Sequence, residues 1–123
     1  MRQLKVRYRP EAVDDLEDIF RYVFRISASQ VTAQNFVGRL RARCRRIGLV
    51  PLGGRARDDL EPGLRTVPFE HIAVIAYTVE DDCVRITNIF YGGKDYEALY
   101  RNASESESDL DPPRRALGGR PDE

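Results

Sequence analysis

The chain has 123 residues, of which 41% are hydrophobic and 33% are charged, and this predicts a single domain with a small core. Its 20 basic and 20 acidic residues give a formal net charge of zero, which argues against a protein that binds DNA tightly and directly by itself. There is no run of 18 apolar residues and no apolar stretch typical of a signal peptide. We therefore expect a cytoplasmic protein without membrane spans.

The charges are unevenly distributed along the chain. Residues 1–101 carry 17 basic and 14 acidic side chains, a net charge of +3, whereas residues 102–123 carry 3 and 6, a net charge of −3. This last segment also has very few apolar residues, too few to offset the entropy lost on ordering. We expect a folded domain over residues 1–101 and an acidic, disordered tail over residues 102–123.

The cysteines and the histidine do not form a metal-binding pattern. Cys44 and Cys83 are far apart in the sequence, and His71 is the only histidine. Metal sites in proteins use paired Cys and His ligands at short spacings. We therefore expect no metal and no cofactor, two buried thiols that act as small apolar groups, and a histidine in a turn between strands.

The N-terminal segment predicts a strand followed by a helix. Leu4, Val6 and Tyr8 alternate with basic residues, which is the pattern of a half-buried strand. Pro10 ends this strand and suits the first turn of a helix, where its missing N–H costs nothing. Beyond it, apolar residues recur every three or four positions, and they predict a helix over about residues 10–26.

A second amphipathic helix follows after a short break. Ser29 or Thr32 is expected to cap its N-terminus, and Gly48 is expected to end it. Arginines crowd the second half of this helix, where positive charge interacts favourably with the helix dipole. Two helices joined by so short a link predict an antiparallel hairpin.

The remainder of the domain predicts strands. Residues 51–63 form a loop rich in Gly and Pro. Three strands follow over Leu64–Phe69, Ile72–Val79 and Cys83–Tyr91, with a tight turn between the last two, and residues 94–101 predict a short C-terminal helix. The resulting order, β-α-α-β-β-β, predicts an α+β fold in which an antiparallel sheet packs against an N-terminal helical hairpin.

Four segments of the chain form an ordered set of motifs: Tyr8-Arg9-Pro10-Glu11-Ala12, Asn35-Phe36-Val37, Arg57-Asp58-Asp59-Leu60 and Phe90-Tyr91-Gly92-Gly93-Lys94-Asp95. Together they resemble the RelE/ParE toxin family, and its ParE branch most closely. The resemblance covers about residues 4–101. Two positions depart from the family pattern, because Tyr91 replaces the usual His and Lys94 replaces the usual Arg.

The resemblance implies one of two activities. RelE-like members cut messenger RNA on the ribosome, and ParE-like members inhibit DNA gyrase without cutting nucleic acid. Arg65, Lys94 and Tyr100 match positions of the RelE-like nuclease site, but Val67 and Val74 are apolar where that site is basic. This favours a gyrase-inhibiting toxin that is not an enzyme. The alternatives are a ribosome-dependent endoribonuclease that uses Arg65, Lys94 and Tyr100, and a non-toxic member that only binds an antitoxin.

The resemblance also implies a ParD-like antitoxin as the partner, in a hetero-oligomeric complex. Arg39, Arg43 and Arg46 are the candidate antitoxin contacts, because an arginine-rich helix face suits an acidic partner. An ordinary solvated helix face is the alternative interpretation of these three residues.

The surface that meets the target is placed near the last strand and the terminal helix. Arg65, Tyr91 and Lys94 are the candidate target-binding residues, because polar groups gather there after two apolar strands. The alternative is structural for two of them: Arg65 then pairs with a nearby carboxylate, and Tyr91 is a packed aromatic residue.

Overall fold

A computed structural model describes residues 3–92 and 96–100 of the chain. Its helices and strands, in chain order, are β1 (Lys5–Tyr8), α1 (Pro10–Ser27), α2 (Gln30–Ile47), β2 (Arg55–Ala56), β3 (Leu64–Phe69), β4 (Ala73–Val79) and β5 (Cys83–Tyr91). Residues 96–100 are helical. The predicted α+β fold is confirmed, and the predicted helices and long strands agree with the observed ones to within one or two residues.

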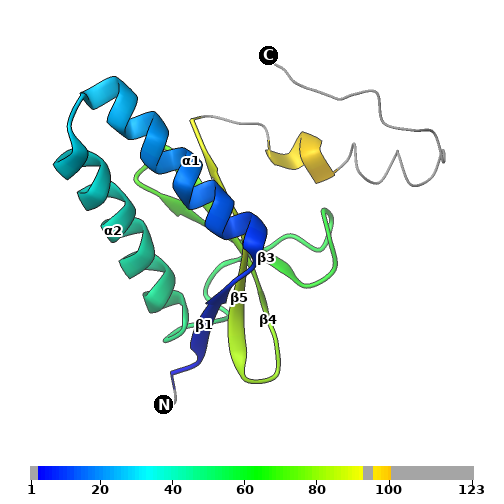
Figure 1. The fold of residues 1–123 in the computed structure, drawn as a ribbon. Coiled ribbons are helices and arrows are strands. Elements are labelled where there is room, and N and C mark those ends of the chain that lie inside the picture. Colours follow the sequence, from blue (N-terminus) through cyan, green and yellow to red (C-terminus); the bar gives the residue numbers. More distant parts are fainter. Residues whose placement is uncertain (1–2, 93–95, 101–123) are drawn as a thin grey trace.

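The molecule has two main layers, a helical hairpin and a sheet (Figure 1). The strand order in the sheet is β1-β5-β4-β3-β2. Strands β3 to β5 pair antiparallel, as predicted, and β2 pairs antiparallel with β3. Strand β1 instead pairs parallel with β5, from Lys5 opposite Cys83 to Tyr8 opposite Ile86. The expectation of a purely antiparallel sheet is therefore wrong for its first strand, because long-range packing, which leaves no local signal, sets the partner of β1.

The ends of the hairpin helices follow from local chemistry. Pro10 occupies the first turn of α1, and the αL conformation of Ala28 (φ 57°) ends that helix. The Ser29 hydroxyl accepts a hydrogen bond from the backbone N–H of Thr32 at 3.1 Å, so Ser29 is the N-cap of α2. Gly48 ends α2 as predicted, and a side chain there would overlap the carbonyl oxygen of Leu4. The glycine is therefore required by the close approach of β1.

The main core lies between the hairpin and one face of the sheet. The helices contribute the apolar stripe that the sequence predicts, including Leu16, Ile19, Phe36 and Leu40. Both thiols are buried, with Cys44 0% and Cys83 3% exposed, in agreement with the sequence prediction.

A smaller cluster covers the opposite face of the sheet. Leu64, Ala76 and Phe90 are buried there, with Tyr96 and Tyr100 of the terminal helix packed against them. The Phe90 ring stacks on Tyr96, with ring centroids 5.4 Å apart, and meets Tyr100 edge-on at 6.3 Å. The terminal helix is thus held on the far face by aromatic contacts.

The loop predicted over residues 51–63 contains one additional strand. Arg55 and Ala56 of β2 pair with Thr66 and Arg65 of β3, so the sheet has five strands. Two residues are too few to produce a periodic pattern, which explains why the sequence did not reveal this strand. No helix among the described residues is long and apolar enough to cross a membrane, and those residues contain no cluster of three or more possible metal ligands.

Candidate functional site

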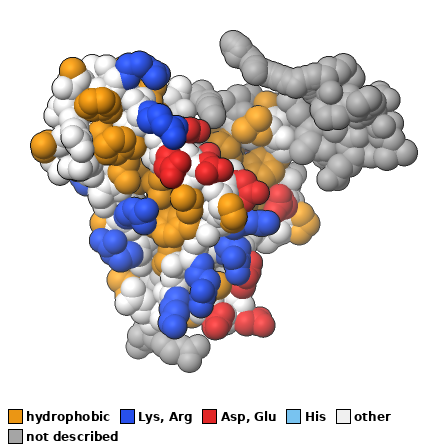
Figure 2. Space-filling view, viewed as in Figure 1, with side chains coloured by type: hydrophobic (Ala, Val, Ile, Leu, Met, Phe, Trp, Pro, Cys, Tyr) orange, Lys and Arg blue, Asp and Glu red, His pale blue; other side chains and the backbone are white. Residues whose placement is uncertain are grey.

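The part of the chain that holds α2 lacks acidic residues. Residues 19–57 contain nine arginines and neither Asp nor Glu. Figure 2 shows the result on one face, where basic side chains gather over α2 and β1 while acidic ones lie over α1 and toward β4. An arginine-rich surface of this kind attracts an acidic partner.

The arginines of α2 differ in what they contact. Arg39 forms a bidentate ion pair with Glu70, at 2.8 and 3.1 Å, and lies over the ring of Phe36. The side chains of Arg43 and Arg46 form no hydrogen bond or ion pair with any residue that the structure describes. Of the three predicted antitoxin contacts, Arg39 is therefore already neutralised within the domain, and the other two present unpaired positive charge.

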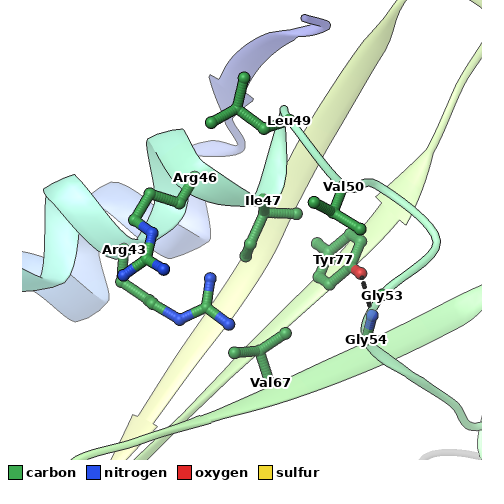
Figure 3. A pocket seen from close by; sticks show the side chains of 9 residues that line it. All are labelled: Arg43, Arg46, Ile47, Leu49, Val50, Gly53, Gly54, Val67 and Tyr77. Carbon is green, nitrogen blue, oxygen red and sulfur yellow. Dashed lines mark hydrogen bonds between the residues drawn. The ribbon is translucent and has the colours of Figure 1, made fainter. Parts of the chain in front are cut away.

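Arg43 and Arg46 line a cavity of about 260 Å³ at the C-terminal end of α2, which we call the arginine pocket. Figure 3 shows both side chains reaching from α2 toward it. Its lining consists of Arg43, Arg46, Ile47, Leu49, Val50, Gly53, Gly54, Val67 and Tyr77.

The arginine pocket combines apolar and cationic surface. Ile47, Val67 and Tyr77 are buried, whereas Leu49 and Val50 are 48% and 63% exposed at the edge. The described residues that line it include no His, Cys, Asp or Glu, so the lining offers neither a carboxylate nor an imidazole for general acid–base catalysis. Its chemistry suits an acidic peptide with an apolar anchor.

Two side chains fix the loop that forms one wall of the arginine pocket. The Tyr77 hydroxyl donates to the carbonyl of Pro51 at 2.8 Å and accepts from the backbone N–H of Gly54 at 2.9 Å. Arg65 donates to the carbonyls of Leu52 and Gly54, at 3.1 and 2.8 Å. Burial raises the pKa of Tyr77, so this hydroxyl stays protonated and remains able to donate at neutral pH.

These contacts give Arg65 a structural function. It was predicted as a target-binding residue or as part of a nuclease site, with pairing to a carboxylate as the structural alternative. Arg65 instead donates to two backbone carbonyls and so supports the loop. Its side chain remains partly exposed.

The residues predicted for a nuclease site do not converge. Arg65 pairs across β3 and β4 with Tyr77, which belongs to the core beneath the hairpin, whereas Tyr100 packs on the far face. Successive side chains of a strand point to opposite faces, so Arg65 and Tyr100 lie on opposite sides of the sheet. Lys94 lies outside the described residues. Val67 is buried in the core and Val74 packs with the far cluster.

Tyr91 is an aromatic packing residue at the end of β5. Its ring meets Tyr22 and Phe36 edge-on, with centroids 5.2 and 5.5 Å apart, and burial raises its pKa. Tyr91 pairs with Ala73, whereas Arg65 pairs with Tyr77, four residues further along β4. At a rise of about 3.3 Å per residue this places Tyr91 and Arg65 about 13 Å apart along the strand direction, so they do not form one cluster.

Residues 6–96 match the family described as the ParE toxin of the type II toxin–antitoxin system parDE. The chain belongs to this ParE toxin family. No match was found among curated protein sequences. Among solved structures, a chain of the chromosomal ParDE toxin–antitoxin system from P. aeruginosa is similar, with a TM-score of 0.63 and 19% identity over 73% of this chain and 97% of that chain. That identity supports a shared fold only.

Sequence reasoning missed one arginine that organises this ParE domain. Arg57 is only 6% exposed, and it binds Asp59 through two nitrogens at 3.0 and 2.8 Å. It also contacts Glu97 at 2.7 Å and the Tyr96 hydroxyl at 3.2 Å. The hydrogen bonds that Arg57 donates to the carboxylates of Asp59 and Glu97 raise the pKa of Arg57. The terminal helix of the ParE fold is thus joined to the loop before β3.

The sequence pattern does not predict most of the contacts of Arg57. Asp59 is close in the chain, but Tyr96 and Glu97 follow some 40 residues later, and no local pattern predicts a contact over that distance. A detectable signal for the arginine pocket was present, namely the absence of acidic residues from residues 19–57. That absence leaves the arginines of α2 without acidic neighbours along the helix itself.

Proposed function

We propose that this ParE family member is a toxin that inhibits DNA gyrase without cutting nucleic acid, and that a ParD-like antitoxin neutralises it. Membership of the ParE toxin family supports the toxin function. The observation that carries the mode of action is the separation of Arg65 and Tyr100 on opposite faces of the sheet.

A ribonuclease of the RelE type needs groups that meet at one phosphate. One group activates the 2′-hydroxyl, others stabilise negative charge, and an acid protonates the leaving oxygen. Here Arg65 is committed to two backbone carbonyls. Burial raises the pKa of Tyr100, so its phenol stays protonated at neutral pH and does not serve as a base. These features favour inhibition by binding.

The antitoxin is proposed to place an acidic segment on the α2 surface. Arg43 and Arg46 supply unpaired charge, and the apolar lining of the arginine pocket supplies burial for a hydrophobic side chain. Charge-assisted hydrogen bonds between Arg and carboxylates are among the stronger polar contacts in proteins. Arg39 is proposed to contribute through its exposed edge while it remains paired with Glu70.

Induction of the toxin without its antitoxin tests the mode of action. We expect filamentous growth with a DNA-damage response in cells and loss of supercoiling by purified gyrase, both reversed by a ParD-like antitoxin. Tyr100→Phe is the matched variant, because it removes only the hydroxyl of the candidate nuclease site and keeps the ring that packs on Phe90.

The outcomes separate the three activities. Toxicity that survives Tyr100→Phe, together with gyrase inhibition, supports the proposal. Rapid translation arrest with cleaved messenger RNA, abolished by Tyr100→Phe, identifies a ribonuclease. Normal growth after confirmed expression identifies a non-toxic member that only binds an antitoxin.

A further inference from the structure

The C-terminal segment is rich in acidic residues, which are absent from the described lining of the arginine pocket. Residues 104–111 read Ser-Glu-Ser-Glu-Ser-Asp-Leu-Asp. Four of the six acidic residues beyond residue 101 lie in this stretch, and they surround a single large apolar residue, Leu110. This segment lies outside the residues that the structure describes, so its binding partner is inferred from the surface that remains open to it.

The arginine pocket offers matching groups. Arg43 and Arg46 have no ion pair with a described residue, and they line a cavity together with apolar side chains. A leucine between two aspartates presents one apolar side chain with a carboxylate on either side. We propose that residues 105–111 of this chain bind its own arginine pocket, with Leu110 in the cavity and Asp109 and Asp111 paired with the two arginines.

The chain is long enough to make this contact. The terminal helix ends at residue 100 of the described part, and nine further residues in extended conformation span about 30 Å. The terminal helix and the arginine pocket are linked by one loop, because Arg57, three residues after Gly54 of the pocket lining, contacts Tyr96 and Glu97. A segment of this length can therefore span from the terminal helix to the arginine pocket.

Attachment in the same chain favours this segment over a second copy. A flexible linker of this length gives an effective concentration on the order of 1 mM, far above the concentration at which a small cytoplasmic protein normally meets its copies. If the proposed function holds, this binding competes with the antitoxin and lowers the toxin's apparent affinity for it. The docking itself is independent of the proposed function, and it is tested with this chain alone.

The test uses a fluorescent peptide of residues 104–112 and the full chain, with binding followed by fluorescence anisotropy. In Asp109→Asn/Asp111→Asn the chain's own segment binds the arginine pocket more weakly, so we expect the free peptide to bind there. If the peptide Kd is about 0.1 mM, the wild-type chain should bind it about tenfold more weakly, because the attached segment occupies the pocket. Asp122→Asn/Glu123→Gln removes the same charge elsewhere in the tail and should behave like the wild type.

A second pair of variants locates the binding site. Arg46→Glu, added to Asp109→Asn/Asp111→Asn, should abolish peptide binding, whereas Arg45→Glu makes the same charge change one residue away, outside the arginine pocket, and should retain most of it. Equal peptide affinity in the wild type and Asp109→Asn/Asp111→Asn would overturn the proposal, as would no binding to either. An equal gain from Asp122→Asn/Glu123→Gln would show a non-specific charge effect. A difference that disappears when the protein is diluted would assign the contact to a second copy.

Discussion

The hydroxyl of Tyr77 both donates to Pro51 and accepts from the N–H of Gly54, so a side chain rooted in the centre of the sheet determines the path of the loop outside it. Gly54 must be glycine for this arrangement, because a Cβ there would overlap the Tyr77 hydroxyl. The same loop carries Leu49 and Val50 to the edge of the arginine pocket. A buried polar group thus shapes a surface that it does not itself expose.

Tyr77→Phe tests this dependence. The substitution keeps the ring but leaves the buried N–H of Gly54 without its acceptor, which should cost about 1–3 kcal/mol of folding free energy. Urea unfolding measures the loss, and hydrogen exchange at the Gly54 amide should become faster. Tyr22→Phe is the control, because the Tyr22 side chain is 39% exposed and its hydroxyl forms none of these loop contacts. An effect of Tyr77→Phe no larger than that of Tyr22→Phe would show that the loop does not depend on the hydroxyl.

At the scale of elements, an ion pair joins α2 to the turn between β3 and β4. Arg39 binds Glu70, and both Glu70 and His71 have positive φ, 50° and 61°. Non-glycine residues in this conformation carry a backbone cost of about 1 kcal/mol or more each. The ion pair therefore stabilises a turn conformation that Glu70 and His71 do not themselves favour. One member of this pair is Arg39, a predicted antitoxin contact.

The pH dependence of stability reports this contact. The hydrogen bond from Arg39 holds the pKa of Glu70 below its usual value, so the stabilisation is complete above that usual value, about 4.5, and is lost as pH falls through the lower folded pKa. Glu70→Gln should reduce the free energy of unfolding by about 0.5–1 kcal/mol at pH 7, the upper range for exposed pairs. Denaturant unfolding at pH 7, 5 and 3 should show this difference shrinking at pH 3. A difference that stays constant with pH would contradict a role for the carboxylate charge.

Local signals explain which elements the sequence predicted. Pro10 and Ser29 mark helix starts because they act on the adjacent backbone, and the observed N-cap hydrogen bond from Thr32 to Ser29 follows from that chemistry. The parallel pairing of β1 and the pairing of Arg39 with Glu70 join residues far apart in the chain. Neither of these long-range pairings produces a periodic pattern in the sequence. The sequence therefore predicted arginines on α2 without showing which of them form an ion pair within the described domain.

At the scale of the whole molecule, the charges are separated by element. The stretch from residue 19 to residue 57 carries only positive charge, whereas the first turns of α1 and the turn before β5 carry acidic groups. Such a separation costs some stability through repulsion among like charges. Binding of an acidic partner relieves this repulsion between like charges. We propose that the antitoxin is such a partner.

The affinity for the proposed ParD-like antitoxin should therefore depend on particular arginines and on salt. Arg43→Glu/Arg46→Glu reverses the two arginine charges of the arginine pocket, which pair with no described residue, and we expect the Kd to rise about 100-fold, or about 1.4 kcal/mol for each charge. Arg41→Glu/Arg45→Glu makes the same change of net charge on the same helix, outside the arginine pocket, and should raise the Kd much less. Isothermal titration at 0.05, 0.15 and 0.5 M salt should give a steeper salt dependence for the wild type than for Arg43→Glu/Arg46→Glu, because salt screens the contacts that this variant lacks. Equal losses in the two double variants would mean that the antitoxin responds to the overall charge of α2, and the arginine pocket would then no longer be its specific binding site.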